Sequence, residues 1–313
     1  METGKNRRTL SIIIPLYDAE AYVGKALESI FDTTASSGQF EVIVVNDGST
    51  DGSLDVVKKF ADRPNLTVLD LENQGPSAAR MSGFPHAQGE YIWFMDSDDY
   101  LVEDGVGKVL RLLEDRPGVD VLMFPLVRTD GEDFPLDYRI DGEMRMEGKD
   151  IVKNPALPEW SAPRYVLKRS LMENPWVRFP KGLIHEDNYI GIVLLYLAKD
   201  VRVMKDPVYI HLIRPGSVMM SLTKKSSYDM VAIHRLLRRF MKEVMDPSEW
   251  DWLRKYSFKL LEFCNDRFPV SGLGKKGLYL WCAWKEAYPE SSWKTKVKRF
   301  LFFSMPQTFA RYR

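Results

Sequence analysis

Three acidic side chains follow directly on an apolar run. The run YIWFM occupies residues 91–95, and Asp96, Asp98 and Asp99 come next. Carboxylates crowded at one strand end repel one another, and a divalent cation, which takes oxygen ligands, offsets that repulsion. The pattern therefore predicts a metal site. Acids in this position can also cap a following helix, which is the role we expect for Asp99.

Two other apolar runs end near a residue that could contact a ligand. LSIIIPLY (10–17) ends at Tyr17, and EVIVVNDG (41–48) contains Asp47. If these runs are parallel strands, their carboxyl ends meet at one edge of a sheet, and the ligand crevice of such sheets lies beyond that edge. Tyr17, Asp47 and Asp96 are therefore expected to line one site.

The elements that would position these residues alternate along the first hundred positions. Strands are expected at 10–17, 41–48, 67–71 and 91–95. Helical spacing of apolar residues separates them, with Asp18 expected to cap the first helix and GPSAARMSGF (75–84) expected to form the third. Buried strands separated by amphipathic helices indicate an α/β fold with a parallel sheet covered on both faces.

Beyond residue 100 the pattern is mixed. The expected elements are a helix at 102–115, a strand at 120–127, a polar hairpin at 129–147, a buried helix near 188–198, and strands at 201–204 and 207–213. From about residue 223 onward, helical periodicity dominates to the end of the sequence.

Composition excludes several classes of protein. The 313 residues include 45% hydrophobic and 28% charged side chains, which is ordinary for a folded soluble protein. No apolar run is long enough for a membrane-spanning helix and no signal peptide is evident, so a cytoplasmic protein is expected. Cys264 and Cys282 are expected to be buried thiols. Equal numbers of basic and acidic residues, 44 of each, argue against a nucleic-acid-binding protein.

Four linked segments resemble the family 2 inverting glycosyltransferases, which have the GT-A fold. In order, they are SIIIPLYDAEAYVGKALESI, VIVVNDGSTDGS, NQGPSAARMSGFPHAQGEYIWFMDSDDYL and FPKGLIHED. The resemblance implies a GT-A domain at 1–222, with a nucleotide-binding half at about 9–100 and an acceptor-binding half at about 101–222, and then a C-terminal helical region at 223–313. It also implies transfer of a sugar from a UDP-sugar to a hydroxyl of a glycan or glycolipid in surface polysaccharide biosynthesis.

By this resemblance, one set of residues holds the sugar donor: Pro15, Leu16, Tyr17, Glu20, Asp47, Gly75, Arg80, Asp96 and Ser97. Tyr17 would cover a face of the base, and Asp47 would accept the imide N–H of uracil, which favours a uridine donor. Without the resemblance, Tyr17 could be a core aromatic, Asp47 a turn residue and Arg80 a surface arginine. Arg214 and Ser217 are implied to fold over the diphosphate, with an ordinary turn as the alternative.

The resemblance also implies that the acidic cluster binds a cation. Asp98 would bind Mg²⁺ or Mn²⁺, which bridges the diphosphate, while Asp96 would contact the ribose or a water on the metal. A hard cation neutralises the charge that develops on the departing diphosphate. His211 is implied as a second metal ligand, as in some relatives, and a buried core histidine is the alternative.

In the segment HED, Asp187 is implied as the catalytic base, with Glu186 beside it. Inverting transfer needs one carboxylate to take the proton of the attacking hydroxyl and needs no covalent intermediate. Acids in the first turn of a helix are also common as partners of the helix dipole. Trp160 and Arg164 stand where many relatives carry a Trp–Asn–Lys-like segment, and together with His185 they are the expected acceptor contacts.

The C-terminal segment SSWKTKVKRFLFFSMPQTFARYR (291–313) mixes basic and aromatic residues. Residues 223–313 hold 19 Lys and Arg against 9 Asp and Glu. This favours an interfacial helix on an anionic bilayer, at the inner face of the cytoplasmic membrane. A helix packed on its neighbours, or a contact between copies of the chain, is the alternative.

Two other functions remain as alternatives. A nucleotide-sugar-binding or scaffold protein without turnover would keep the same pocket, although the paired acids argue against it. A nicotinamide oxidoreductase is disfavoured because no G-x-G-x-x-G follows the first strand.

Overall fold

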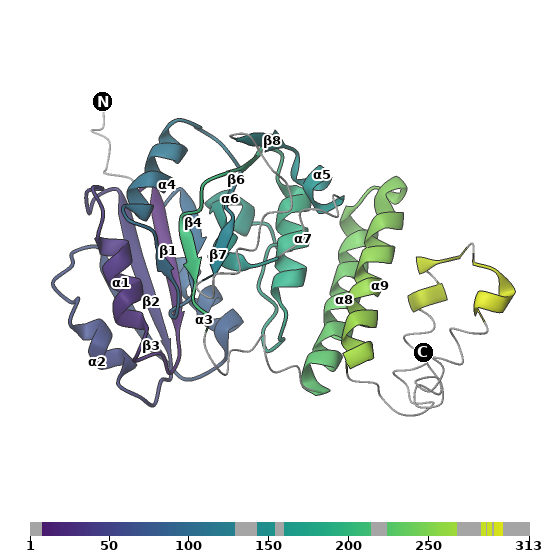
Figure 1. The fold of residues 1–313 in the computed structure, drawn as a ribbon, viewed down its shortest axis with the longest axis horizontal. Helices are drawn as coiled ribbons and strands as arrows, with labels where there is room; N and C mark the ends of the chain where they lie inside the picture. Colours follow the sequence, from purple (N-terminus) through teal and green to yellow (C-terminus); the bar gives the residue numbers. More distant parts are fainter. Residues whose placement is uncertain are drawn as a thin grey trace. The chain divides into compact units, whose positions relative to one another are not determined.

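The computed structural model describes residues 8–128, 143–153, 160–213 and 224–267, with short stretches at 283–285, 287–289 and 291–296. Figure 1 shows the chain as a ribbon. Its internal contacts divide the chain into two compact units, Met1–Gly182 with Glu186–Pro215, and Leu183–His185 with Gly216–Arg313. Each unit is described by itself.

The first unit is built on an eight-stranded sheet of order β3-β2-β1-β4-β9-β6-β10-β8. Its strands are β1 (Leu10–Leu16), β2 (Phe40–Asp47), β3 (Leu66–Leu71), β4 (Tyr91–Phe94), β6 (Val121–Met123), β8 (Met144–Met146), β9 (Tyr165–Lys168) and β10 (Val201–Val203). Strands β1 to β4 run parallel, whereas β9 is antiparallel to both of its neighbours and β8 is antiparallel to β10. The four strands expected in the first hundred residues are confirmed, and the remainder of the sheet is mixed.

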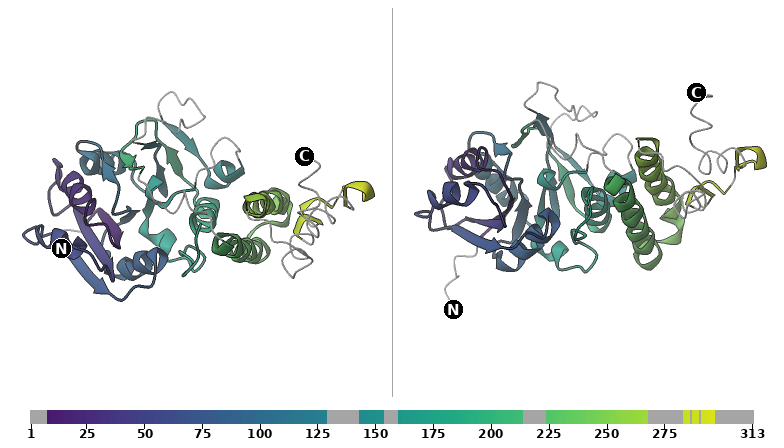
Figure 2. Two further views of the ribbon diagram at one scale, coloured as in Figure 1. Left: turned by 60° about the horizontal axis from the view of Figure 1, so that its bottom comes forward. Right: turned by 90° about the horizontal axis from the view of Figure 1, so that it is seen from below.

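Helices cover both faces of this sheet (Figures 1 and 2). The even-numbered residues of β1 belong to one buried cluster with apolar residues of α1 (Val23–Phe31) and α4 (Gly105–Glu114). Successive residues of a strand point to opposite faces, so Ile13 faces the other way. There α3 (Pro76–Gly83) packs so closely that a Cβ on Gly83 would lie 2.6 Å from the Ile13 side chain. The remaining helices of this unit are α2 (Ser53–Lys58), α5 (Gly148–Lys153), α6 (Arg169–Met172) and α7 (Asp187–Leu197).

A small second sheet corrects one expected strand. The run at 120–127 is two strands, β6 in the large sheet and β7 (Leu126–Arg128) in a three-stranded sheet of order β5-β11-β7. The break falls at Pro125, which has no N–H to continue a ladder. The other strands of this sheet are β5 (Tyr100–Leu101) and β11 (Tyr209–His211). It thereby joins the segment after the acidic cluster to the strand that carries His211.

The first helix also begins differently from the expectation. Helix α1 starts at Val23, Tyr22 is its N-cap residue, and that residue makes no side-chain capping bond within the described part of the chain. Asp18 does not cap it. Its backbone is left-handed, with φ of 44°, and its carboxylate accepts the Thr50 N–H at 2.7 Å instead. The prediction of a capping role for Asp18 was therefore wrong.

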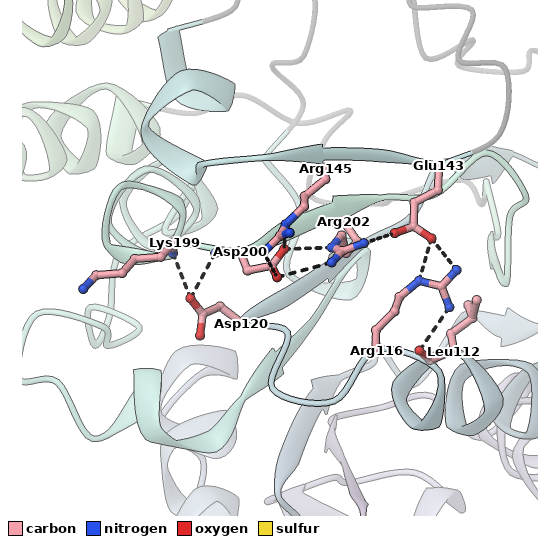
Figure 3. A network of polar contacts seen from close by, with 8 residues as sticks. All are labelled: Leu112, Arg116, Asp120, Glu143, Arg145, Lys199, Asp200 and Arg202. Carbon is pink, nitrogen blue, oxygen red and sulfur yellow. Dashed lines mark hydrogen bonds and ion pairs between the residues drawn. The ribbon is translucent and has the colours of Figure 1, made fainter.

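A network of ion pairs between arginine and acidic side chains connects β8 and β10 of the large sheet (Figure 3). Glu143, just before β8, accepts hydrogen bonds from Arg116 and from Arg202 of β10. Asp200 accepts from Arg202 at 2.7 Å and from Arg145 of β8 at 2.9 Å. These ion pairs link β8 to β10 by side chains as well as by backbone bonds. Of the polar hairpin expected at 129–147, positions 129–142 lie outside the described residues.

From residue 224 onward, the described part of the second unit is mainly helical. Helices α8 (Lys224–Val244) and α9 (Trp250–Arg267) pack on one another. Of the apolar residues at helical spacing in α8, Ile233, Leu237 and Phe240 are fully buried, whereas Leu236 is partly exposed. None of the helices that the structure describes has both the length and the apolar character needed to cross a membrane. Of the segment 291–313, only 291–296 is described, and the side chains of both cysteines lie outside the described residues.

Candidate functional site

The candidate site lies where β1, β2 and β4 end. These three neighbouring strands are parallel, and their register pairs Leu16 with Asn46. Tyr17, Asp47 and Asp96 each come at or just after the end of their strand. The sheet therefore brings together the three residues that the sequence placed at strand ends.

Tyr17 presents its ring to solvent. The side chain is 49% exposed although it follows a fully buried strand. The neighbouring Asp18 raises the pKa of the Tyr17 hydroxyl above its ordinary value, mainly by charge repulsion of the phenolate. Glu20, in the same loop, accepts the Gly52 N–H at 3.0 Å. An exposed aromatic ring at this edge is available to stack on a planar ligand group, and Tyr17 is not the core residue that its sequence position also allowed.

Asp47 holds the segment before α3. It is 4% exposed, and its two carboxylate oxygens accept the N–H groups of Gln74 and Gly75, each at 2.8 Å. Gly75 is the N-cap of α3 with φ of 89°, a conformation that favours glycine. A Cβ there would meet no described atom within 4 Å. Asp47 therefore makes the turn contacts that its residue type allowed, at the strand end where base recognition was expected.

Arg80 lies one turn inside α3 and is buried, not a surface arginine. Its guanidinium donates to Asp96 Oδ1 at 2.7 Å and to Glu186 Oε1 at 2.9 Å, and it lies 5.1 Å from the Phe179 ring centroid. Burial alone would lower the pKa of Arg80, but the charges of Asp96 and Glu186 outweigh burial and raise it above its ordinary value. The guanidinium thus joins the end of β4 to the start of α7.

Asp187 is the first residue of α7, and its carboxylate is strongly perturbed. The Oδ1 atom is buried and has no hydrogen-bond partner among the described residues. Burial, followed by the charge of Glu186, raises the pKa of Asp187 to about 8, and the nearby Arg80 opposes that rise. Glu186, the N-cap residue, makes no side-chain capping bond within the described residues. The Asp187 carboxyl group is therefore suited to take a proton near neutral pH.

Asp99 does not cap the following helix. Helix α4 begins at Gly105, with Asp104 at its N-cap. Asp99 is 1% exposed and points toward β11, where it accepts hydrogen bonds from the Tyr209 hydroxyl and from the Leu212 N–H. The prediction for Asp99 was wrong because β5 intervenes between the acidic cluster and α4, and the aspartate is buried against β11 instead.

His211 comes within reach of this acidic cluster. Its Nδ1 lies 3.1 Å from both oxygens of Asp99, and its side chain is 30% exposed. The hydrogen bond to Asp99 raises the pKa of His211, burial opposes the rise, and the charges of Asp96 and Asp98 add to it. The imidazole is therefore not enclosed in the core, which was the alternative.

The donor atoms here fit a divalent cation that a ligand helps to hold. Among the described residues, no three His, Cys, Asp or Glu side chains form a group that could hold a metal ion by themselves. Asp98 is partly exposed, and the Nδ1 contact with Asp99 leaves the Nε2 of His211 as the ring nitrogen for a metal. Carboxylate and imidazole donors suit Mg²⁺ or Mn²⁺ when phosphate oxygens and water complete the shell.

The expected acceptor residues are mostly inside the protein. Trp160 is 8% exposed, and a Cβ on Gly191 of α7 would lie 2.6 Å from its ring. Arg164 is 3% exposed and donates from Nε to the Phe124 carbonyl at 3.1 Å. His185 has a left-handed backbone with φ of 66°.

Several other expected site residues have simple placements. Pro15 and Leu16 are buried in β1, and Ser97 is buried in the acidic cluster. Arg214 and Ser217 lie outside the described residues. The sequence did not single out Tyr209 or Phe179, which contact the acidic cluster and Arg80, because aromatic residues in apolar runs carry no local mark of a polar partner.

Comparisons with known proteins identify the family of the chain. A model of the family Glycosyl transferase family 2 matches residues 11–174, just over half of the chain. The poly(ribitol-phosphate) beta-N-acetylglucosaminyltransferase TarS of Staphylococcus aureus is 26% identical over 265 residues, which cover 83% of this chain and 44% of TarS. The poly(ribitol-phosphate) beta-glucosyltransferase of Bacillus spizizenii is 26% identical over 219 residues, which cover 68% of this chain and 33% of that enzyme. The chain thus spans less than half the length of these relatives.

Solved structures show the same fold. The crystal structure of TarS 1–349 in complex with UDP-GlcNAc superposes with a TM-score of 0.66 at 22% identity, covering 96% of this chain and 83% of that one. The mannosyltransferase PcManGT from Pyrobaculum calidifontis, in complex with GDP-Man and Mn²⁺, superposes with a TM-score of 0.57 at 17% identity, covering 95% and 86%. These likenesses confirm the α/β GT-A fold expected from the sequence.

Proposed function

The chain belongs to glycosyl transferase family 2, and on this premise we propose that it is an inverting, metal-dependent glycosyltransferase that uses a UDP-sugar. The observation that carries the proposal is the Arg80 bridge, which joins Asp96 at the end of β4 to Glu186 beside the perturbed Asp187. Asp187, whose pKa is raised, follows Glu186 directly, and Arg80 links Glu186 to the strand edge at which Tyr17 is exposed, which supports a common site. One site then holds both a surface for a nucleotide and a base for a hydroxyl.

The donor half of the site follows from the strand ends. Tyr17 stacks on the uracil ring, and Asp47 accepts the uracil N–H through a lone pair that its two loop bonds leave open, since a carboxylate oxygen can accept twice. Glu20 is exposed in the loop after the same strand, whereas Pro15 and Leu16 are buried in β1 and support this edge from within the sheet. This assignment rests on the exposure of Tyr17 and on the position of Asp47 at the neighbouring strand end.

The diphosphate and sugar lie toward the acidic cluster in this proposal. Asp98 and His211 would hold a divalent cation, with Asp96 beside them. The cation, when bound, neutralises charge on the departing diphosphate. Gly75 leaves open space before α3, and Ser97 lies in the acidic turn. Arg80 acts indirectly, because its guanidinium donates to the carboxylates of Asp96 and Glu186 and positions them.

Asp187 is the base in this mechanism. The acceptor hydroxyl oxygen attacks the anomeric carbon from the face opposite the diphosphate, and the bond between that carbon and the phosphate oxygen breaks with its electron pair on UDP. Asp187 takes the hydroxyl proton, so an α-linked donor gives a β-linked product. Glu186 holds the Arg80 bridge, and burial keeps the basicity of Asp187 above that of an ordinary aspartate.

The names of two relatives suggest the chemical class of the acceptor. Two relatives are named for transfer to poly(ribitol-phosphate). We propose a hydroxyl of a surface glycan or of a lipid-linked glycan as the acceptor here, reached from the cytoplasmic side of the membrane.

Trp293 in the segment 291–296 is 78% exposed, which supports contact of the C-terminal segment with a lipid surface. Co-sedimentation with anionic vesicles, lost on Trp293→Ala, is the expected result; equal sedimentation of both proteins would contradict it.

Donor binding can be tested directly with a thermal-shift panel of nucleotides and UDP-sugars, each with and without Mn²⁺. A ligand that binds only the folded state raises the melting temperature, so UDP and a UDP-sugar with Mn²⁺ should stabilise most. GDP and CDP serve as matched controls. Release of UDP from the stabilising donor, measured with a glycan acceptor, tests turnover. Stabilisation by a purine nucleotide alone would contradict the donor assignment.

A further inference from the structure

Asp99 is the hub of a buried hydrogen-bond network. Asp99 follows β4 of the large sheet, but its partners are two residues of β11 in the small sheet and Leu212, the residue after β11. Its carboxylate accepts hydrogen bonds from the Tyr209 hydroxyl and from the Leu212 N–H, the latter at 2.8 Å. It also contacts His211 Nδ1 at 3.1 Å. One buried carboxylate thus holds three groups around the end of β11.

The Tyr209 hydroxyl extends this network to the turn before Asp98. Tyr209 is fully buried, and its oxygen accepts the Asp96 N–H at 3.2 Å while its hydrogen goes to Asp99. A continuous chain of hydrogen bonds therefore runs from the backbone of Asp96, through Tyr209 and Asp99, to the ring of His211. The acidic turn and the imidazole are fixed relative to one another by groups that lie in the interior.

The contact with Asp99 decides which ring nitrogen of His211 is free for a ligand. When Asp99 is ionised its carboxylate only accepts hydrogen bonds, so a neutral imidazole in this contact donates from Nδ1. Nε2 then keeps its lone pair. Histidines that bind metals are held in this way, with the other ring N–H donated to a carboxylate that fixes the tautomer and the ring orientation.

We propose that Asp99 is a positioning residue that sets the tautomer and orientation of His211, so that Nε2 is the nitrogen left to bind a divalent cation beside Asp98. Tyr209 supports Asp99 in this role by tying it to the Asp96 backbone. The inference rests on the proposed function, because it needs a cation held together with a nucleoside diphosphate. It assigns Asp99, which the sequence placed at a helix cap, to the metal site without making it a ligand.

A purely structural tie between the two sheets would use the same bonds, so the test must act on the tautomer. Asp99→Asn keeps the size of the side chain. Its amide oxygen can accept the Leu212 N–H in place of Oδ1, and its NH₂ then replaces Oδ2, the oxygen that accepts from Tyr209 and contacts His211 Nδ1. The carboxylate that holds the proton on Nδ1 is lost, which favours the tautomer protonated on Nε2 and weakens metal binding through that nitrogen.

The experiment measures Mn²⁺ affinity by electron paramagnetic resonance of the free ion, in the presence of saturating UDP. Four proteins are compared: wild type, Asp99→Asn, His211→Ala and the double variant. Loss of an outer-shell partner typically weakens metal binding about 10- to 100-fold. We expect a weakening in this range for Asp99→Asn and no further weakening when it is added to His211→Ala. Asp104→Asn, which alters another hydrogen-bonded aspartate with partners Thr33, Thr34 and Arg111, should leave the affinity unchanged.

Two results would overturn the inference. In one, Asp99→Asn binds Mn²⁺ as tightly as the wild type; in the other, it weakens binding equally in the His211→Ala background. Failure of the wild type to bind Mn²⁺ with UDP contradicts the proposed metal dependence itself and is thus distinguishable. Nitrogen-15 NMR of the metal-free wild type at alkaline pH gives a test that needs no variant. His211 should carry its proton on Nδ1, and a proton on Nε2 would contradict the proposal.

Discussion

Replacing Arg80 with methionine should damage both the stability and the pH dependence of the enzyme. Methionine keeps much of the apolar contact with Phe179 but removes the charge between Asp96 and Glu186. The Arg80 and Glu186 side chains are only 6% and 12% exposed, so the ion pair that joins them is buried. Breaking a buried ion pair by removing one partner costs about 3–5 kcal/mol, because the other charge stays buried and unpaired. We expect a loss near the lower end, since the Asp96 side chain is 32% exposed and can be solvated.

The effect on catalysis follows from the charge of Arg80. Arg80 lowers the pKa of Asp187 against the larger effect of burial, so its removal should raise that pKa further above about 8. A base must be deprotonated to act, so the acidic limb of kcat/KM should move to higher pH and activity at neutral pH should fall.

The assay has two parts, urea unfolding and a pH profile of sugar transfer at saturating Mn²⁺. The matched control is Arg111→Met. Arg111 also forms an ion pair, with Asp104 at 2.8 Å, but its side chain is 56% exposed, so the loss should be at most about 1 kcal/mol. An unchanged acidic limb in Arg80→Met, together with a stability loss no larger than in Arg111→Met, would refute the reasoning.

Three further variants test other parts of the structure. Asp187→Asn should stabilise the folded protein increasingly as pH rises, because folding raises the pKa of Asp187 to about 8 and ionisation of this buried carboxyl group at pH values above its ordinary pKa opposes folding. Thermal melts across pH check this, and a difference in melting temperature between the two proteins that does not change with pH would contradict it. Tyr17→Ala should weaken UDP binding by about 1–3 kcal/mol in calorimetry with little change in melting temperature, since the ring is 49% exposed, whereas Tyr17→Phe should retain affinity. Gly83→Ala should destabilise by about 1–3 kcal/mol in urea, because its Cβ would lie 2.6 Å from Ile13; Gly24→Ala, with 3.4 Å to Val56, is the tolerated control.

The sequence allowed the first half of the fold to be predicted because its strands are buried on both faces. Strands β1, β2 and β4 are buried along their whole length, and such continuous apolar runs stand out from helical spacing. The strand-end rule then placed Tyr17, Asp47 and Asp96 at one edge. Local pattern failed at 120–127, where a single apolar run serves two sheets and the break at Pro125 depends on their pairing.

Contacts between distant residues could not be predicted from local chemistry. Asp18 and Asp99 both had residue types that cap helices, but one turned to the Thr50 loop and the other to β11. The bond from Arg80 to Glu186 joins residues 106 positions apart. Such partners depend on how the sheet and helices pack, so the types of the site residues could be read from the sequence but their partners could not.

The most direct test of the proposed mechanism is transfer by Asp187→Asn, with donor affinity measured on the same protein. The amide cannot take the hydroxyl proton, so the rate constant for transfer should fall about 10²- to 10⁴-fold while the Kd for the UDP-sugar stays near that of the wild type. Asp55→Asn, on the exposed side of α2, is the control and should behave as the wild type. Wild-type transfer by Asp187→Asn at equal donor affinity would contradict the central claim.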